Sequence, residues 1–79
     1  MPENPGTTAR VATPTQLGAL LQERRKAAGL SQQDLAEWAG VSRQYVSLLE
    51  TGDVSLQVKR LFDLFGVLGC DLAVVDRAR

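Results

Sequence analysis

Residues 31–50, SQQDLAEWAGVSRQYVSLLE, constrain the fold more than any other stretch, because they predict two short helices joined by a tight turn. Ser31 and Ser42 are suited to cap these helices, since a hydroxyl oxygen accepts from the free amides of a first helical turn. Gly40 stands between the helices, where the backbone needs a left-handed residue. Apolar residues at helical spacing face inward on both helices: Leu35, Ala36, Ala39, Val46 and Leu49. The stretch therefore reads as helix, turn, helix.

The rest of the chain predicts two further helices and one strand. Residues 13–16, TPTQ, form a capping box, so we expect a helix over 14–28. Ser55 caps another helix over about 56–68, which Gly69 closes. Residues 70–75, CDLAVV, are rich in β-branched side chains and predict a strand. We expect an all-α fold of four to five short helices with a C-terminal β-strand.

These elements divide the chain into four parts. Residues 1–12, MPENPGTTARVA, have little to bury, so we expect a disordered N-terminal arm. Residues 13–69 form the domain itself, residues 70–76 form the C-terminal strand, and residues 77–79 are a tail.

Two features predict that the chain forms a dimer. The apolar side chains of residues 56–68 cover an arc of about 160°, wider than one core-facing stripe needs. No other segment predicts a strand that could pair with residues 70–76, and an isolated strand leaves its backbone groups unpaired. We therefore expect this strand to pair with its own copy across a two-fold axis, although an unpaired ordered tail is an alternative. The expected interface residues are Phe62, Phe65, Leu72 and Val74.

Length and composition exclude several classes of protein. The 79 residues allow one small domain, and the net charge of zero argues against indiscriminate binding to nucleic acid, although not against a specific site. The chain has one cysteine and no histidine, so we expect no internal disulfide, no metal site, no cofactor and no enzymatic activity. No stretch approaches the roughly 20 apolar residues of a membrane span. We expect a cytoplasmic protein that does not contact a membrane.

The second helix of residues 31–50 begins with Arg43 and Gln44, which lie outside its apolar face. A protein that contacts base edges in the major groove would carry such side chains at the start of its recognition helix. With this feature, residues 17–69 resemble the helix-turn-helix family of lambdoid phage repressors and Cro, in its small bacterial form called Xre-like. TPTQL at residues 13–17 and LGCDLAVVD at residues 68–76 are similar, more narrowly, to HipB-like antitoxins. That resemblance implies a lambda-repressor-like domain whose C-terminal strand is swapped across the dimer.

The resemblance also implies which residues contact double-stranded DNA. The positions that match base-reading residues are Arg43, Gln44, Ser47 and Leu48. The expected phosphate contacts are Gln32, Ser42, Tyr45, Arg24 and Lys26. Arginine suits guanine and glutamine suits adenine, whereas Leu48 offers only apolar contact where the family commonly has a polar residue. For each of these residues, the alternative is a solvated position with no ligand.

Three further residues have other expected roles. Arg25 and Glu50 match an arginine and a glutamate that form a partly buried ion pair in the phage repressors, and this pair is structural. Trp38 lies off the inward face of its helix, so it could belong to a partner interface or pack under a loop or the N-terminal arm.

The function that the resemblance implies is a homodimeric transcriptional repressor of a palindromic operator. As a HipB-like antitoxin it would also bind and neutralise a HipA-like kinase toxin and repress their shared operon. The alternatives are a free-standing Xre-like or prophage regulator, and an interaction adaptor that keeps the fold without binding DNA.

Overall fold

The computed structural model describes residues 8–77, which form four helices and a two-stranded sheet. The elements in chain order are β1 (Thr8–Val11), α1 (Pro14–Ala27), α2 (Gln32–Ala39), α3 (Arg43–Glu50), α4 (Leu56–Val67) and β2 (Leu72–Val75). The predicted helix-turn-helix fold with a C-terminal strand is therefore confirmed. None of the helices in residues 8–77 has the length and apolar character needed to cross a membrane.

Each helix begins at a hydroxyl side chain, which explains why the helix starts follow from the sequence. Thr13, Ser31, Ser42 and Ser55 each accept a hydrogen bond from the backbone amide three residues later. Ser31 also donates its own amide to Asp34 Oδ2 at 3.0 Å, and this bond lowers the pKa of Asp34. These bonds satisfy amides that have no partner within their own helix.

The turn between α2 and α3 depends on Gly40, which has φ 74° and ψ 30°. Residues with a side chain rarely adopt this left-handed conformation. It lets the amide of Val41 donate to the carbonyl of Ala36 at 3.0 Å, so the chain reverses and only three residues separate α2 from α3.

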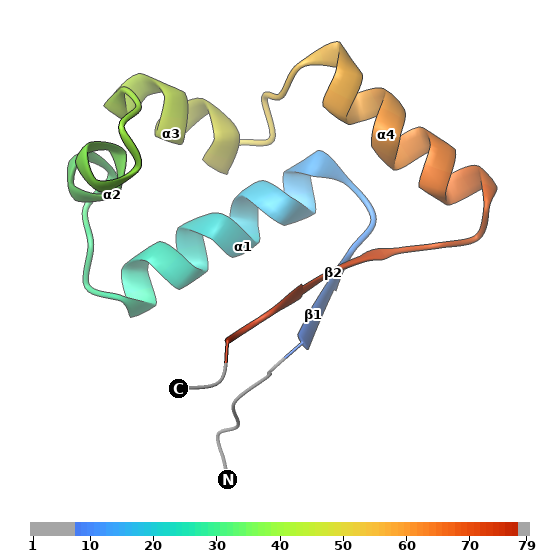
Figure 1. Cartoon of the computed structure of the whole chain (residues 1–79), viewed down its shortest axis with the longest axis horizontal. Helices are drawn as coiled ribbons and strands as arrows, with labels where there is room; N and C mark the ends of the chain where they lie inside the picture. Colours follow the sequence, from blue (N-terminus) through green and yellow to red (C-terminus); the bar gives the residue numbers. More distant parts are fainter. Residues whose placement is uncertain (1–7, 78–79) are drawn as a thin grey trace, which may run out of the picture.

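Helix α1 lies at the centre of the molecule, with α2 and α3 on one side and the two strands on the other (Figure 1). Helix α4 follows α3 and lies at the end of the molecule that is remote from α2 (Figure 1). The chain then returns along α1, so that β2 comes to lie beside β1. The helix-turn-helix unit and the sheet therefore occupy opposite sides of α1.

The sheet corrects two of our expectations. Residues 8–11 form β1 and do not belong to a disordered arm, and they pair antiparallel with β2 of the same chain, from Thr8 opposite Val75 to Val11 opposite Leu72. Because β1 already satisfies one edge of β2, that strand does not require a copy of itself. The rest of the expected arm, residues 1–7, and residues 78–79 of the tail lie outside the described residues.

The core is small and lies on both sides of α1. The buried apolar side chains of residues 8–77 are Val11, Ala36, Val46 and Phe62. Leu35 and Leu49 are half-buried, whereas Ala39 is exposed at the end of α2, contrary to its expected inward orientation. Ala39 directly precedes the Gly40 turn, where the chain turns away toward α3.

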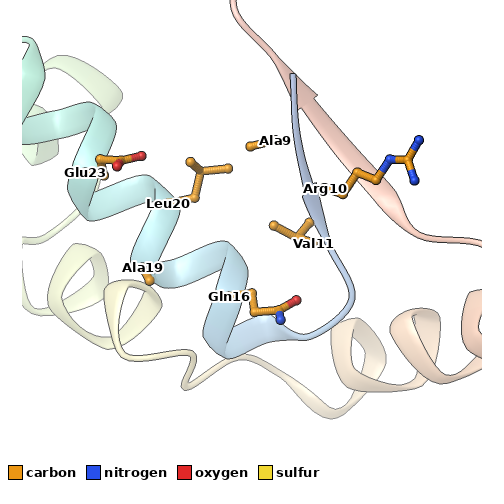
Figure 2. A pocket seen from close by; sticks show the side chains of 7 residues that line it. All are labelled: Ala9, Arg10, Val11, Gln16, Ala19, Leu20 and Glu23. Carbon is orange, nitrogen blue, oxygen red and sulfur yellow. The ribbon is translucent and has the colours of Figure 1, made fainter. Parts of the chain in front are cut away.

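The sheet covers α1 incompletely and leaves a shallow groove of about 310 Å³ between them. Figure 2 shows Ala9 and Val11 of β1 directed toward Leu20 on α1, while Arg10 points away from the helix. A smaller apolar groove of about 210 Å³ lies where Val74 faces Leu17 and Leu21. The inward residues of both strands therefore pack on α1, in agreement with their lower exposure.

Candidate nucleic-acid interface

Helix α3 presents one face to the core and the opposite face to solvent. Val46 and Glu50 are buried, and Leu49 is half-buried. Arg43, Gln44 and Leu48 are exposed on the other side, and Ser47 is half-buried at its edge. The four expected base-reading residues therefore lie together on or beside the solvent face of one helix, which is the size of element that a major groove admits.

Two expected phosphate contacts lie at the start of this helix. The hydroxyl oxygen of Ser42 accepts from the amide of Tyr45 at 3.0 Å, and its own proton remains able to reach an anion. Tyr45 is 51% exposed, so about half of this residue is open to solvent. Both are placed beside the exposed face that carries Arg43 and Gln44.

An ion pair holds α3 against α1. Arg25 Nε lies 2.5 Å from Glu50 Oε2, and Arg25 Nη2 donates to Glu50 Oε1 at 3.2 Å. The side chains are only 8% and 2% exposed. The hydrogen bond from Arg25 lowers the pKa of Glu50, and the same bond raises the pKa of Arg25. The structure thus brings together the two residues expected to form a structural ion pair.

Gln32 connects this ion pair to the exposed face of α3. Its Nε2 donates to Glu50 Oε1 at 2.9 Å, and its Oε1 accepts from Arg43 Nη1 at 3.4 Å. The sequence predicted a phosphate contact for Gln32 but not this bridge, which joins residues far apart in the chain. Arg43 is therefore positioned by a polar side chain that is itself bound to the buried pair.

The two basic residues at the end of α1 have different surroundings. Lys26 is exposed. Arg24 belongs to the side of α1 that faces the sheet, where its Nε lies 2.9 Å from Asp76 Oδ1 and its Nη1 lies 3.4 Å from Glu23 Oε1. Two carboxylates already surround its charge, so the structure favours a role for Arg24 in holding the end of β2 rather than the expected contact with phosphate.

Gly18 is a structural requirement of this interface that sequence analysis missed. It is buried in α1 against the end of α3, and a Cβ atom there would lie 2.7 Å from the carbonyl oxygen of Glu50. Its signal in the sequence is a single glycine inside an otherwise helical stretch, which indicates close packing. Without a side chain at this position, α1 and α3 can approach closely enough to form the ion pair.

The expected dimer residues do not form one exposed surface. Phe62 is only 7% exposed and packs inside the chain, while Phe65, Leu72 and Val74 are half-buried. The apolar arc of α4 is divided between two sides, because part of it covers the core of its own chain. The exposed apolar residues of α4 are Leu56, Leu61, Leu64 and Val67, and Leu68, which directly follows the helix, is exposed as well.

Trp38 is 81% exposed on α2. No described loop covers it, and residues 1–7 of the arm, the other covering that the sequence suggested, lie outside the described residues. Of the two expectations, a partner interface is the one that such exposure favours.

Comparison with known proteins agrees with this geometry. Residues 16–77 match the model of a family described as a helix-turn-helix domain. The chain is also 33% identical, over 66 residues, to a protein of Sinorhizobium fredii (strain NBRC 101917 / NGR234) named "Uncharacterized HTH-type transcriptional regulator y4mF". This alignment covers 84% of the chain and 87% of the relative.

Proposed function

We propose that this chain, which belongs to the helix-turn-helix domain family, is a transcriptional regulator that reads double-stranded DNA with α3. One observation carries the proposal: the start of α3 exposes Arg43 and Gln44, while Val46 and Glu50 on its opposite face are buried and Glu50 is paired with Arg25 of α1. A rigidly held helix with an exposed Arg-Gln start suits hydrogen bonding to base edges in the major groove. The name of the S. fredii relative supports the same role.

In this proposal, Arg43 and Gln44 make the specific contacts, to guanine and adenine respectively. Ser47 and Leu48 face the same groove, where Leu48 offers apolar contact to a thymine methyl group. The phosphate contacts are Ser42, Tyr45, Lys26 and the amide of Gln32 at the start of α2, a position suited to an anion. Arg24 is left out of this set because Asp76 and Glu23 already pair with it.

The regulator acts as a homodimer on an inverted repeat. A two-fold axis gives two copies of α3, and a palindromic operator presents two matching half-sites. The exposed apolar residues of α4 supply surface for such a dimer. The cytoplasm is the location that this role implies.

Two finer roles are compatible with the same interface. One is a HipB-like antitoxin that neutralises a HipA-like kinase toxin, for which the exposed Trp38 would be a contact. The other is a free-standing Xre-like regulator, which fits the name of the S. fredii relative equally well. Copurification with the product of a neighbouring kinase-like gene would distinguish them. The third alternative, an interaction adaptor that does not bind DNA, is excluded if the protein binds its upstream DNA specifically in the test below.

The test measures binding of the protein to the DNA upstream of its own gene. We expect Arg43→Ala and Gln44→Ala each to lose about 1–3 kcal/mol of binding free energy and to relax base preference. Arg77→Ala, which removes the same charge beyond β2, is the control and should change affinity little. Lys26→Ala should weaken binding to all sequences and reduce the salt dependence. Unchanged affinity in both α3 variants would refute the proposed interface.

A further inference from the structure

One face of α4 carries residues that repeat at intervals of four, three and four. They are Leu56, Arg60, Asp63 and Val67. With about 100° per residue, these four positions lie within about 60° of one another on the helix. All four are exposed, and the exposed fractions of Leu56 and Val67 are 64% and 84%. We refer to this set as the α4 stripe.

The charges in the middle of the α4 stripe have no partner in the described part of the chain. Between residues 8 and 77, neither Arg60 nor Asp63 forms an ion pair or a side-chain hydrogen bond, although they lie three residues apart. The stripe thus combines two large apolar residues at its ends with an unpaired positive and negative charge between them.

We propose that a second copy of this chain covers the α4 stripe, with the two α4 helices packed antiparallel about a two-fold axis between residues 61 and 62. In this register each residue faces the partner residue at an equal distance on the other side of the axis. Arg60 then faces the partner's Asp63, and Leu56 faces the partner's Val67. The two-fold axis repeats both contacts, so two ion pairs lie between two apolar contacts.

The alternatives do not satisfy the stripe equally well. A parallel pair of helices would place Arg60 against Arg60 of the partner subunit, where like charges repel. An unrelated partner would need a complementary sequence, whereas the antiparallel register needs only the chain itself. The order of the charges and the symmetric positions of Leu56 and Val67 therefore favour self-association.

The position of α4 is compatible with DNA binding by the dimer. Figure 1 shows α4 at the end of the molecule remote from α2, so a partner on its outer face leaves the start of α3 open. The inference deepens the proposed regulator, on which it rests, by specifying how its two copies meet. Because α4 is only about 18 Å long, we expect a dimer that dissociates in the micromolar range and is weakened by salt.

The experiment uses charge reversal in the full chain. Arg60→Asp makes both central charges negative, and Asp63→Arg makes both positive. Alone, each variant should dimerise at least about tenfold more weakly than the wild-type chain, because two attractions become two repulsions. An equimolar mixture should form a heterodimer, and the double variant Arg60→Asp/Asp63→Arg should dimerise like the wild type. Sedimentation velocity measures all four cases.

Controls separate loss of the dimer from loss of the fold. Lys59→Asp has the same charge change about 70° from the centre of the stripe and should leave the dimer intact. Far-ultraviolet circular dichroism should show unchanged helix content in every variant. The register would be overturned by single variants that dimerise normally or by a mixture that does not form a heterodimer. It would also be overturned by a wild-type chain that is monomeric at about 100 μM, well above the expected range of the dissociation constant.

The proposed function is tested separately with the operator. If Arg43→Ala weakens specific binding as expected while the charge-reversal variants dimerise normally, the register fails and the DNA interface stands. If the mixture pairs as expected but Arg43→Ala does not change DNA binding, the register stands and the proposed DNA interface fails.

Discussion

Gln32, the first residue of α2, donates a 2.9 Å hydrogen bond to the carboxylate of Glu50, the last residue of α3. The same carboxylate binds Arg25 of α1, so one side chain connects three helices. Polar contacts therefore act together with the small apolar core in holding the helix-turn-helix unit against α1.

Glu50→Gln should destabilise the protein, because it leaves the guanidinium of Arg25 without a charged partner in a buried place. We expect a fall in melting temperature on the order of 5–10 °C at neutral pH, measured by circular dichroism. Glu37→Gln, an exposed change of the same kind on α2, should have little effect.

The ion pair also predicts how stability depends on pH. Since the pKa of Glu50 is lower in the folded chain than in the unfolded one, ionised Glu50 stabilises the fold above its unfolded pKa. That contribution is lost as pH falls below the ordinary glutamate pKa of about 4.3 and through the folded value. The difference in melting temperature between the wild type and Glu50→Gln should therefore shrink in this acidic range. A constant difference would show that the pair is not coupled to folding.

Substitution of two helical glycines by alanine should change the free energy of unfolding in opposite directions. Gly18→Ala should lower the free energy of unfolding by about 1–3 kcal/mol, because the new Cβ meets the backbone of Glu50. Gly66→Ala, in α4, meets nothing within 4 Å and should raise it by about 0.5–1 kcal/mol through better helix propensity. Urea denaturation measures both, and a stabilised Gly18→Ala would contradict the close approach of α1 and α3.

The β1 strand should contribute to stability through its buried side. Val11 is 3% exposed, so Val11→Ala should cost about 2 kcal/mol in the free energy of unfolding. Val75 lies in the same sheet but is 54% exposed, and Val75→Ala should change stability by less than about 0.5 kcal/mol. Equal effects of the two changes would mean that β1 does not pack on α1 in solution.

The proposed dimer predicts the spacing of its operator. Two copies of α3 can enter successive major grooves on one face of DNA only if the half-site centres lie about 34–36 Å apart or a multiple of this. An insertion of about five base pairs between the half-sites turns one of them to the opposite face, so affinity should fall toward the non-specific level. Footprinting that shows undiminished affinity would mean that the subunits bind independently.

The sequence predicted the helix-turn-helix unit well because its signals are local. The serine caps and Gly40 act within a few residues, and α2 and α3 have the bounds that these residues predict. The face of α4 that meets the core was harder to predict, since the arc was apolar on both sides and only packing places Phe62 inside and Leu64 outside.

Strand β1 could not be predicted from its own residues, TARV, which lie among prolines, glycines and threonines. Its conformation depends on pairing with β2, at the other end of the chain. The bridge through Gln32 was missed for a related reason, because Glu50 and Arg43 approach it only after the turn has formed.

The pairing of β1 with β2 also has a consequence for the order of folding. The hydrogen bonds of the helices and the α2–α3 turn close short loops, whereas the sheet closes a loop that contains every helix of the described chain. Loop-closure entropy makes such distant contacts slow to form. We expect the helical unit to assemble first and the two strands to join last, and their amides to exchange with solvent before those of α1 when the native state opens.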